Sequence, residues 1–475
     1  MKIGVPEVIA GAEFSLQNLA SNLTSEGLTQ LSPDGRVLPK LAENWTWEND
    51  GLALRVNLRP GVVFHNGEAL TASVAADLLR KAIAEPSNRA VYTSFNDVKD
   101  VRPSGESQLV FYLSQRSAFL PEDLVIPVEL GKPSVGTGAY RVSKRDDEGI
   151  SLEGNKRYYL GAPQIDKVQI KPFGALRTAW SGLLRGEVDM VTEVPPDAVE
   201  FIRNDEVQVV SFERRYQYVI AFNSQRRPFN IPLVRRAINA AVDRPALIKS
   251  VLHGLGTPST GPLWPQHWAY DSSMPSFGYD PALATSLLES SGFRLQRGAK
   301  GLPARFHFTC LIPKNFAMSE RMGLEVQKQL YDIGVDMQFE VVPAEELDSR
   351  LRSGRFDALL LDMLGGPTVG RAYMFWASAR NLKGLNLFGY DNPQVERLFG
   401  VLRTTTNEAA VRSATRDLQR ILLDDPPALF LAWSQRSRAV RRAFQVVQDS
   451  GRDPVDPVFT IWRWGANSSR QALAQ

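Results

Sequence analysis

Cysteine and histidine are scarce in this 475-residue sequence. Cys310 is the only cysteine, so the chain forms neither an intramolecular disulfide nor a thiolate metal cluster. The four histidines are His65, His253, His267 and His307, and no two of them have the spacing of metal ligands on one helix. We therefore expect no metal centre and no cofactor.

Long apolar runs and a strong charge imbalance are also absent. The longest apolar runs, such as 428–433, are far shorter than the roughly 20 residues that a transmembrane helix needs. The 55 basic residues are interspersed with 52 acidic ones, whereas nucleic-acid-binding proteins usually gather their cations on one face. We expect a globular protein that does not bind nucleic acid.

The sequence lacks two further kinds of signal. Residues 1–6 carry no apolar core of a secretory signal, so the chain is either cytosolic or a mature secreted form. No G-x-S-x-G, P-loop or H-E-x-x-H motif occurs, and Cys310 falls inside a predicted strand, where a structural thiol is expected. The chain is not expected to be an enzyme.

What the chain does contain is an α/β pattern with clear turn and cap signals. Residues 32–35 predict a turn and residues 49–51 a hairpin. Residues 41–45 predict a short helix that runs into a strand, and Thr71 is expected to cap a helix over 72–84. A chain of this length exceeds one hydrophobic core, which stops growing at about 250–300 residues.

The second half alternates strands and helices. Helices are predicted over 231–252, broken at 243–245, and over 280–291, 319–333 and 345–353; strands are predicted over 305–311, 336–341 and 357–362. This order is typical of parallel α/β structure. The residues by themselves predict two α/β lobes.

Taken together, these segments resemble the family 5 extracellular solute-binding proteins, the oligopeptide, dipeptide and nickel binders of ABC transporters. The densest match is the run 42–72, where an alternating strand precedes Arg59-Pro60-Gly61-Val62-Val63-Phe64-His65-Asn66-Gly67. Further matches follow in the family's order at 136–140, 186–189, 228–238, 241–244 and 389–393. The resemblance extends from about residue 25 to the C-terminus.

The resemblance implies a two-lobed α/β periplasmic binding protein fold of class II type, in the large cluster C form, with an extra α+β satellite subdomain. The first lobe would comprise residues 1–38, 135–224 and 434–475, the satellite subdomain 39–134, and the second lobe 225–433. The chain crossings near 222–223 and 433–434 would act as a hinge.

The function implied is the substrate-binding component of an ABC import system. Such a protein would be a periplasmic monomer, present here in its mature form. It would capture a small polar solute, which is peptide-like, opine-like or a sugar conjugate, between its lobes and deliver it to a membrane permease. An intracellular ligand-sensing domain is an alternative, although no helix-turn-helix segment precedes the fold. A hydrolase is a weaker one.

Sites of this kind are lined by aromatic residues and a few polar groups. The candidates in the first lobe are Glu13, Phe14, Tyr216 and Tyr218, and those in the second are Trp264, Arg371, Tyr373, Asn386 and Trp433. Each has an alternative role in packing or at the surface, because pocket and core aromatics look alike in a sequence. Arg371 follows the Gly-rich segment 365–370 and would grip a carboxylate or phosphate, or be solvated.

Two departures from peptide-binding members bear on the solute. Those members carry an acid just after the strand equivalent to 357–362, where it pairs with the peptide's ammonium; here residues 363–367 contain none, and Asp362 lies earlier. Dipeptide binders place an arginine before the long helix, where this chain has Ser319-Glu320-Arg321. A sugar, an opine-like conjugate, a modified peptide or an aromatic acid stays open, and the few histidines disfavour nickel.

Overall fold

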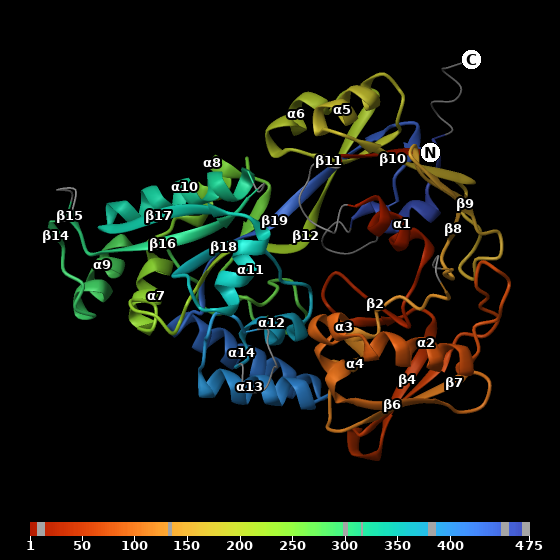
Figure 1. Cartoon of the computed structure of the whole chain (residues 1–475), viewed down its shortest axis with the longest axis horizontal. Helices are drawn as coiled ribbons and strands as arrows, with labels where there is room; N and C mark the ends of the chain where they lie inside the picture. The colour runs from red at the N-terminus through yellow and green to blue at the C-terminus, as the bar shows by residue number, and fades with distance from the viewer. Residues whose placement is uncertain are drawn as a thin grey trace. The chain divides into compact units, whose positions relative to one another are not determined.

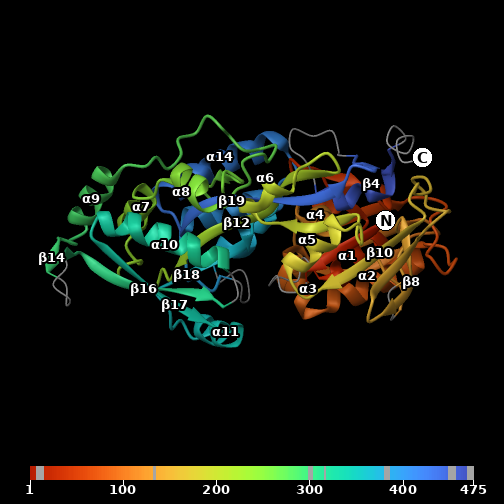
Figure 2. The same cartoon turned by 90° about the horizontal axis from the view of Figure 1, so that it is seen from above.

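The computed structural model describes residues 1–6, 15–131, 135–297, 303–314, 317–378, 386–447 and 456–467. The chain divides into two compact units: unit 1 is Met1–Glu213 with Gln435–Gln475, and unit 2 is Arg214–Ser434 (Figures 1 and 2). Two long strands, β12 (Val207–Phe222) and β19 (Ala428–Arg441), carry the chain from one unit to the other. The lobe boundaries drawn from the sequence stay a prediction.

The first strand of the chain lies inside the main sheet of unit 1. β1 (Lys2–Pro6) pairs in parallel with β10 (Lys167–Phe173) and β11 (Met190–Val194). Beyond β10 follow β9 (Gly149–Gly154), which is antiparallel to β10, and β8 (Tyr140–Asp146), which is antiparallel to β9. On the other side, β19 pairs antiparallel with β11. The helices α1 (Leu16–Thr24) and α5 (Leu176–Leu184) pack on this sheet. Because β1 is buried from its second residue onward, it is almost entirely apolar.

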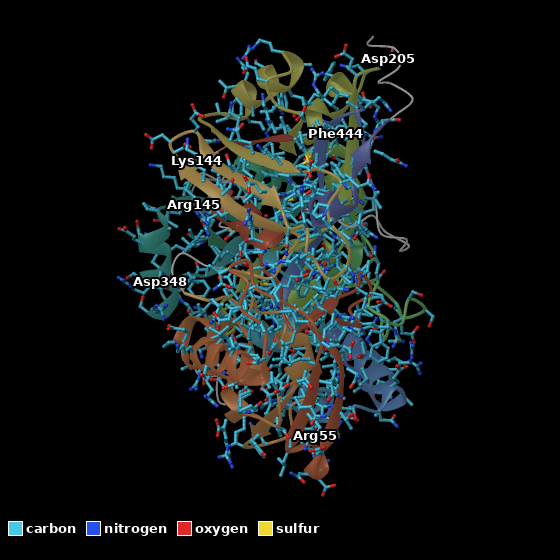
Figure 3. All side chains as sticks on the ribbon, turned by 90° about the vertical axis from the view of Figure 1, so that its right-hand side faces the viewer. Arg55, Lys144, Arg145, Asp205, Asp348 and Phe444 are labelled. Carbon is cyan, nitrogen blue, oxygen red and sulfur yellow. The ribbon has the colours of Figure 1, made fainter. Side chains whose placement is uncertain are left out.

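Unit 1 also contains a separate antiparallel sheet of four strands (Figure 1). Its order is β4 (Ala42–Glu48), β5 (Ala53–Leu58), β7 (Gln108–Leu113) and β6 (Val98–Pro103). The helix α2 (Ala72–Ala84) packs on β6 and β7 over a core that includes Leu54, Phe64 and Phe111. Arg55 of β5, labelled in Figure 3, bonds Glu48 through Nε at 2.7 Å.

This subdomain tests two predictions from the sequence. Thr71 caps α2 as expected, because its hydroxyl oxygen accepts a bond from the Val74 amide at 3.3 Å. The helix predicted over 41–45 is wrong: β4 is already extended from Ala42. Its pairing with β5, from Ala42 opposite Leu58 to Glu48 opposite Ala53, outweighs the weak local helix preference.

Unit 2 has a sheet of largely parallel α/β type, as the second half of the sequence predicted. β16 (Phe306–Pro313) lies between β17 (Val335–Val342) and β18 (Ala358–Leu364), parallel to both, and β12 pairs antiparallel with β18. β13 (Gly256–Pro258) pairs antiparallel with β19. The buried core combines strand residues such as Phe222 and Phe308 with residues of α7 (Pro232–Ala240), α8 (Arg244–Val251) and α10 (Ala317–Asp332).

The other elements complete the two units. In unit 1 they are β2 (Thr29–Leu31), β3 (Val37–Pro39), η2 (Asn49–Gly51), α3 (Pro86–Val91), η3 (Thr93–Asp97), α4 (Leu120–Asp123), η4 (Pro196–Ala198), α6 (Val199–Ile202), β20 (Phe444–Gln445), η5 (Pro457–Arg463) and β21 (Gly465–Ala466). In unit 2 they are α9 (Pro281–Ser290), β14 (Gln296–Arg297), β15 (Pro303–Ala304), α11 (Ala344–Arg352), α12 (Val369–Trp376), α13 (Pro393–Thr404) and α14 (Glu408–Asp424). Within the described ranges, no helix is long and apolar enough to cross a bilayer.

Candidate functional site

The turn that follows β18 brings two of the predicted site residues together in unit 2. The amides of Gly365 and Gly366 both donate to the carbonyl of Arg215, at 3.0 and 2.9 Å. A Cβ on Gly365 would lie 2.3 Å from the ring of Trp433, and one on Gly366 would lie 2.6 Å from Cγ of Arg371. Gly366 also has a φ of +64°, which favours glycine. Because both residues are glycines, the side chains of Trp433 and Arg371 can pack directly against the backbone of this turn.

A third predicted residue joins this group through an aromatic contact. The rings of Trp264 and Trp433 meet edge to face, with centroids 4.8 Å apart and an interplanar angle of 83°. Both indoles are almost fully buried. Among the described residues the Trp433 Nε1 proton has no acceptor, and leaving such a donor buried without a partner costs about 1–3 kcal/mol. The site therefore retains an unused donor.

The same face holds a polar residue that the sequence analysis missed. Gln217 of β12 is fully buried, and its Oε1 accepts a bond from the Ser259 hydroxyl at 2.9 Å. Its Nε2 has no partner within the described part of the chain and lies 3.3 Å from the place where Gly365 would carry a Cβ. One glutamine between two tyrosines carries no signal of burial, which depends on segments far away in the chain.

Ser259 itself is held by a buried arginine. Arg244 donates through Nε to the carbonyl of Ser259 at 2.9 Å and to that of Phe430 at 2.6 Å. Its Nη2 donates to Oδ1 of Asn239 at 2.9 Å. All its hydrogen-bond acceptors in the described structure are neutral oxygens, and burial lowers the pKa of Arg244 to about 9. This network gives the Gln217 side chain a rigid support.

Another charged group lies where β12 and β18 pair. Tyr216 lies opposite Leu364, and Tyr218 opposite Asp362. Arg214 forms a buried ion pair with Asp362, and its guanidinium carbon lies 3.7 Å from the centre of the Tyr216 ring. Arg214 was missed as well, although its spacing of two from Tyr216 places both on one face of the strand.

Three further predicted residues are held by contacts within unit 2. Tyr218 is buried in the apolar core. Tyr373 of α12 packs edge on against Phe399 and accepts a bond from Nη1 of Arg403 at 3.3 Å. Asn386 donates through Nδ2 to two main-chain carbonyls, those of residues 377 and 390. These contacts are structural, and the ligand roles of the three residues stay predictions.

Two of the predicted site residues are not among those that the structure describes. Glu13 and Phe14 lie among residues 7–14, outside the described part of the chain. The candidate site that the structure does assemble in unit 2 therefore consists of Trp264, Trp433 and Arg371 around the Gly365–Gly366 turn, with Gln217, Arg214, Tyr216 and Asp362 on the adjoining strands.

Comparison with known proteins identifies the scaffold. The model of the bacterial extracellular solute-binding proteins, family 5 (middle), matches residues 36–382. The chain belongs to this family. Family 5 consists of solute-binding proteins of ABC transporters, which act outside the cytoplasm and are not enzymes. The family that the sequence motifs indicated is thereby confirmed.

Two curated relatives match along most of the chain. The glutathione-binding protein GsiB of Pectobacterium atrosepticum is 26% identical over 447 residues, which cover 89% of this chain and 85% of GsiB. The oligopeptide-binding protein AppA of Bacillus subtilis is 23% identical over 447 residues, covering 88% of this chain and 82% of AppA. Both identities are low, so they do not name the solute of this family 5 chain.

Solved structures show the same fold. The structure of AppA from Clostridium difficile has a TM-score of 0.84 at 18% identity, covering 98% of this chain and 99% of that one. The structure of Bacillus subtilis AppA in complex with a nonapeptide has a TM-score of 0.77 at 21% identity, covering 98% of both chains. The predicted periplasmic binding protein fold with an extra subdomain, here the four-stranded antiparallel sheet, is confirmed.

Proposed function

We propose that this chain is the periplasmic substrate-binding component of an ABC import system, which captures a small polar solute and delivers it to a membrane permease. The observation that carries the proposal is the cluster around the Gly365–Gly366 turn. It combines two packed indoles with donors on Trp433 and Gln217 that find no acceptor among the described residues. Aromatic walls with a few convergent polar groups are typical of small-molecule sites.

The unused donors favour a solute rich in oxygen acceptors. A carboxylate, a carbonyl or a sugar hydroxyl would accept bonds from the Trp433 indole and the Gln217 amide. These bonds would remove the free-energy cost of leaving the two buried donors without acceptors, which is one reason why polar ligands bind specifically. We therefore propose a solute that brings oxygen acceptors to this face of unit 2.

The charges at the same place disfavour a free α-ammonium. Asp362 is the acid nearest to this turn in the sequence, and it is already paired with Arg214. A cationic group buried beside a carboxylate that is already paired would lose its hydration without gaining an ion pair of comparable strength. An opine-like compound, a sugar conjugate or a peptide-like solute with a blocked amine fits better than a free peptide.

A thermal-shift panel on the purified chain tests the proposal. The probes are reduced glutathione, a nonapeptide and its N-acetylated form, agropinic acid as an opine, a trisaccharide and an aromatic acid. A solute at a hundredfold excess over its Kd stabilises the native state by about 2.7 kcal/mol, a visible shift in Tm. Stabilisation by agropinic acid, the saccharide or the acetylated nonapeptide supports the solute class.

The other outcomes are equally informative. Binding of reduced glutathione or of the free nonapeptide, without binding of the acetylated form, would overturn the proposed solute class and leave the transport role standing. Mass spectrometry of an extract of the denatured protein would reveal a solute that was bound during purification. A chain that holds no solute and is stabilised by none of the probes would contradict capture of a small polar solute.

A further inference from the structure

Trp264 belongs to a long buried connection. Residues 259–280, all of which are described, join β13 to α9 without a helix or strand. Segments of this kind usually run over the surface, because their main-chain polar groups need partners. Here residues 259–270 are buried or half-buried, and Trp264 lies in the middle of them. Something other than secondary structure must hold this segment.

The first end of the segment is attached to β12, β19 and α8. The amide of Ser259 donates to the carbonyl of Leu431 at 3.1 Å, and its carbonyl accepts from Arg244 at 2.9 Å. The Ser259 hydroxyl donates to Gln217. Main chain and side chain are both bonded, so Ser259 is fixed.

The second end is attached to one face of α14. Arg412, Arg416 and Gln419 lie on this face, because they are spaced by four and three residues. Arg412 donates to the carbonyl of Trp268 and lies 5.1 Å from the centre of its ring. Gln419 brackets Asp271, accepting from its amide at 3.0 Å and donating to its carbonyl at 3.1 Å.

The contacts on α14 differ in strength. Arg416 bonds the Asp271 carboxylate at 2.7 Å, but its side chain is 60% exposed, and exposed ion pairs contribute little. The two bonds of Gln419 are part-buried and reach the main chain, which no change of rotamer at Asp271 can release. Gln419 is therefore the principal anchor.

A short series of turns connects this anchor with the indole. The amide of His267 donates to the carbonyl of Trp264 at 3.0 Å, and the amide of Tyr270 donates to the carbonyl of His267 at 2.8 Å. Asp271 follows directly. A cavity of about 20 Å³ separates the segment from α14, enough for about one water molecule. Because these two turns link Asp271 to Trp264 through the main chain, we expect displacement of Asp271 to move Trp264.

From these contacts we propose that Gln419, with Arg416 and Arg412, forms a set of positioning residues that holds Trp264 against Trp433. In Figure 2 the coil that precedes α9 runs beside α14, where these residues lie. The inference rests on the proposed function in one respect: Trp264 and Trp433 are taken to face the solute. The positioning residues do not touch the solute and act through the segment 259–271.

Fluorine NMR of protein labelled with 5-fluorotryptophan tests the positioning directly and needs no solute. The Trp264→Phe variant assigns the Trp264 resonance. In the double variant Arg416→Gln/Gln419→Leu, we expect this resonance to shift or broaden, while those of Trp180 in unit 1 and Trp376 in unit 2 stay in place and report that both units are intact. The single variant Arg416→Gln should stay close to wild type, because the exposed ion pair contributes little.

Arg420 offers a matched control on the same helix. Its side chain is 65% exposed and pairs with Asp417, so Arg420→Gln removes the same charge without touching the segment. The milder Gln419→Glu variant retains the acceptor for the Asp271 amide but places a second carboxylate beside Asp271, and it should move the Trp264 resonance as well. An unchanged Trp264 resonance in the double variant and in Gln419→Glu would overturn the proposal.

Affinity separates this inference from the proposed function. Agropinic acid, or whichever probe of the thermal-shift panel binds the wild type, should bind the double variant about tenfold more weakly, through faster dissociation, an effect of the size that packed side chains transmit. A shifted Trp264 resonance with unchanged affinity would retain the positioning and remove Trp264 from the solute site. An unchanged resonance would remove the positioning alone.

Discussion

Arg214 and Asp362 form an ion pair with side chains only 6% and 7% exposed, although 148 residues separate them in the chain. The pairing of β12 with β18 sets the two strands side by side, with Tyr216 opposite Leu364 and Tyr218 opposite Asp362, and the long Arg214 side chain reaches Asp362. The guanidinium also covers the ring of Tyr216. The pair therefore neutralises the acid at the end of β18 and orders an aromatic side chain beside the candidate site.

Breaking this ion pair should destabilise the protein strongly. Arg214→Met leaves a buried carboxylate without its cation, and removal of one partner of such a pair costs about 3–5 kcal/mol. The double variant Arg214→Met/Asp362→Leu removes both charges and should recover most of that loss. Urea unfolding measures both. Arg420→Gln, which breaks the exposed pair with Asp417, should change the free energy of unfolding by no more than about 0.5 kcal/mol.

Gly365→Ala should destabilise the turn that carries the site. Its new methyl group would lie 2.3 Å from the Trp433 ring, and overpacking of this kind costs about 1–3 kcal/mol. Near-UV circular dichroism should change as well, because the indole must move. Gly400→Ala is the matched control: it lies within α13, a Cβ there would meet nothing within 4 Å, and it should stabilise the protein by about 0.5–1 kcal/mol. Equal effects of the two substitutions would contradict this account.

The stability of unit 1 should depend on pH through His65. Burial lowers the pKa of His65, although its Nε2 bonds the carbonyl of Gly138 at 2.9 Å. Below about pH 6.5, the ordinary value of a histidine, the unfolded chain binds a proton that the folded protein excludes. Stability should therefore fall as the pH decreases from about 6.5 to the lowered pKa.

Thermal unfolding between pH 7.5 and 5 measures this dependence. His65→Gln retains a donor for the Gly138 carbonyl without the titration, so its stability should change less with pH than that of the wild type. His253→Gln, at an exposed position, should follow the wild type. A His65→Gln profile as steep as that of the wild type would assign the dependence to other groups.

The elements of this fold were predictable wherever one segment determines its own structure. The cap at Thr71 and the break at Asp243, which caps α8 through the amide of Ala246, depend on a few neighbouring residues. The strand β4 was not predictable in this way, because its pairing with β5 overrides the preferences of residues 41–45. Local chemistry sets caps and turns, and partner strands decide ambiguous segments.

The candidate site was predictable only in part, for a related reason. Trp264, Trp433 and Arg371 were chosen for their residue types, and the structure places them around one turn. The pairing of Asp362 with Arg214 and the burial of Gln217 depend on contacts between distant strands, which composition does not report. Polar residues at such positions gain their role from the register of the sheet.

Trp433→Phe should weaken solute binding. Phenylalanine retains an aromatic ring but lacks the outer indole edge that faces Gly365 and the Nε1 donor that has no acceptor in the described structure. The net contribution of one hydrogen bond predicts a loss of affinity of about threefold to tenfold, measured by calorimetry with the panel probe that binds the wild type. Trp180→Phe is the control, because Trp180 of unit 1 donates its Nε1 proton to the carbonyl of Glu193 at 3.3 Å. Loss of the indole donor at position 180 should leave the affinity for the probe unchanged. If wild type and Trp433→Phe bind the probe equally well, the Trp433 donor does not bind the solute.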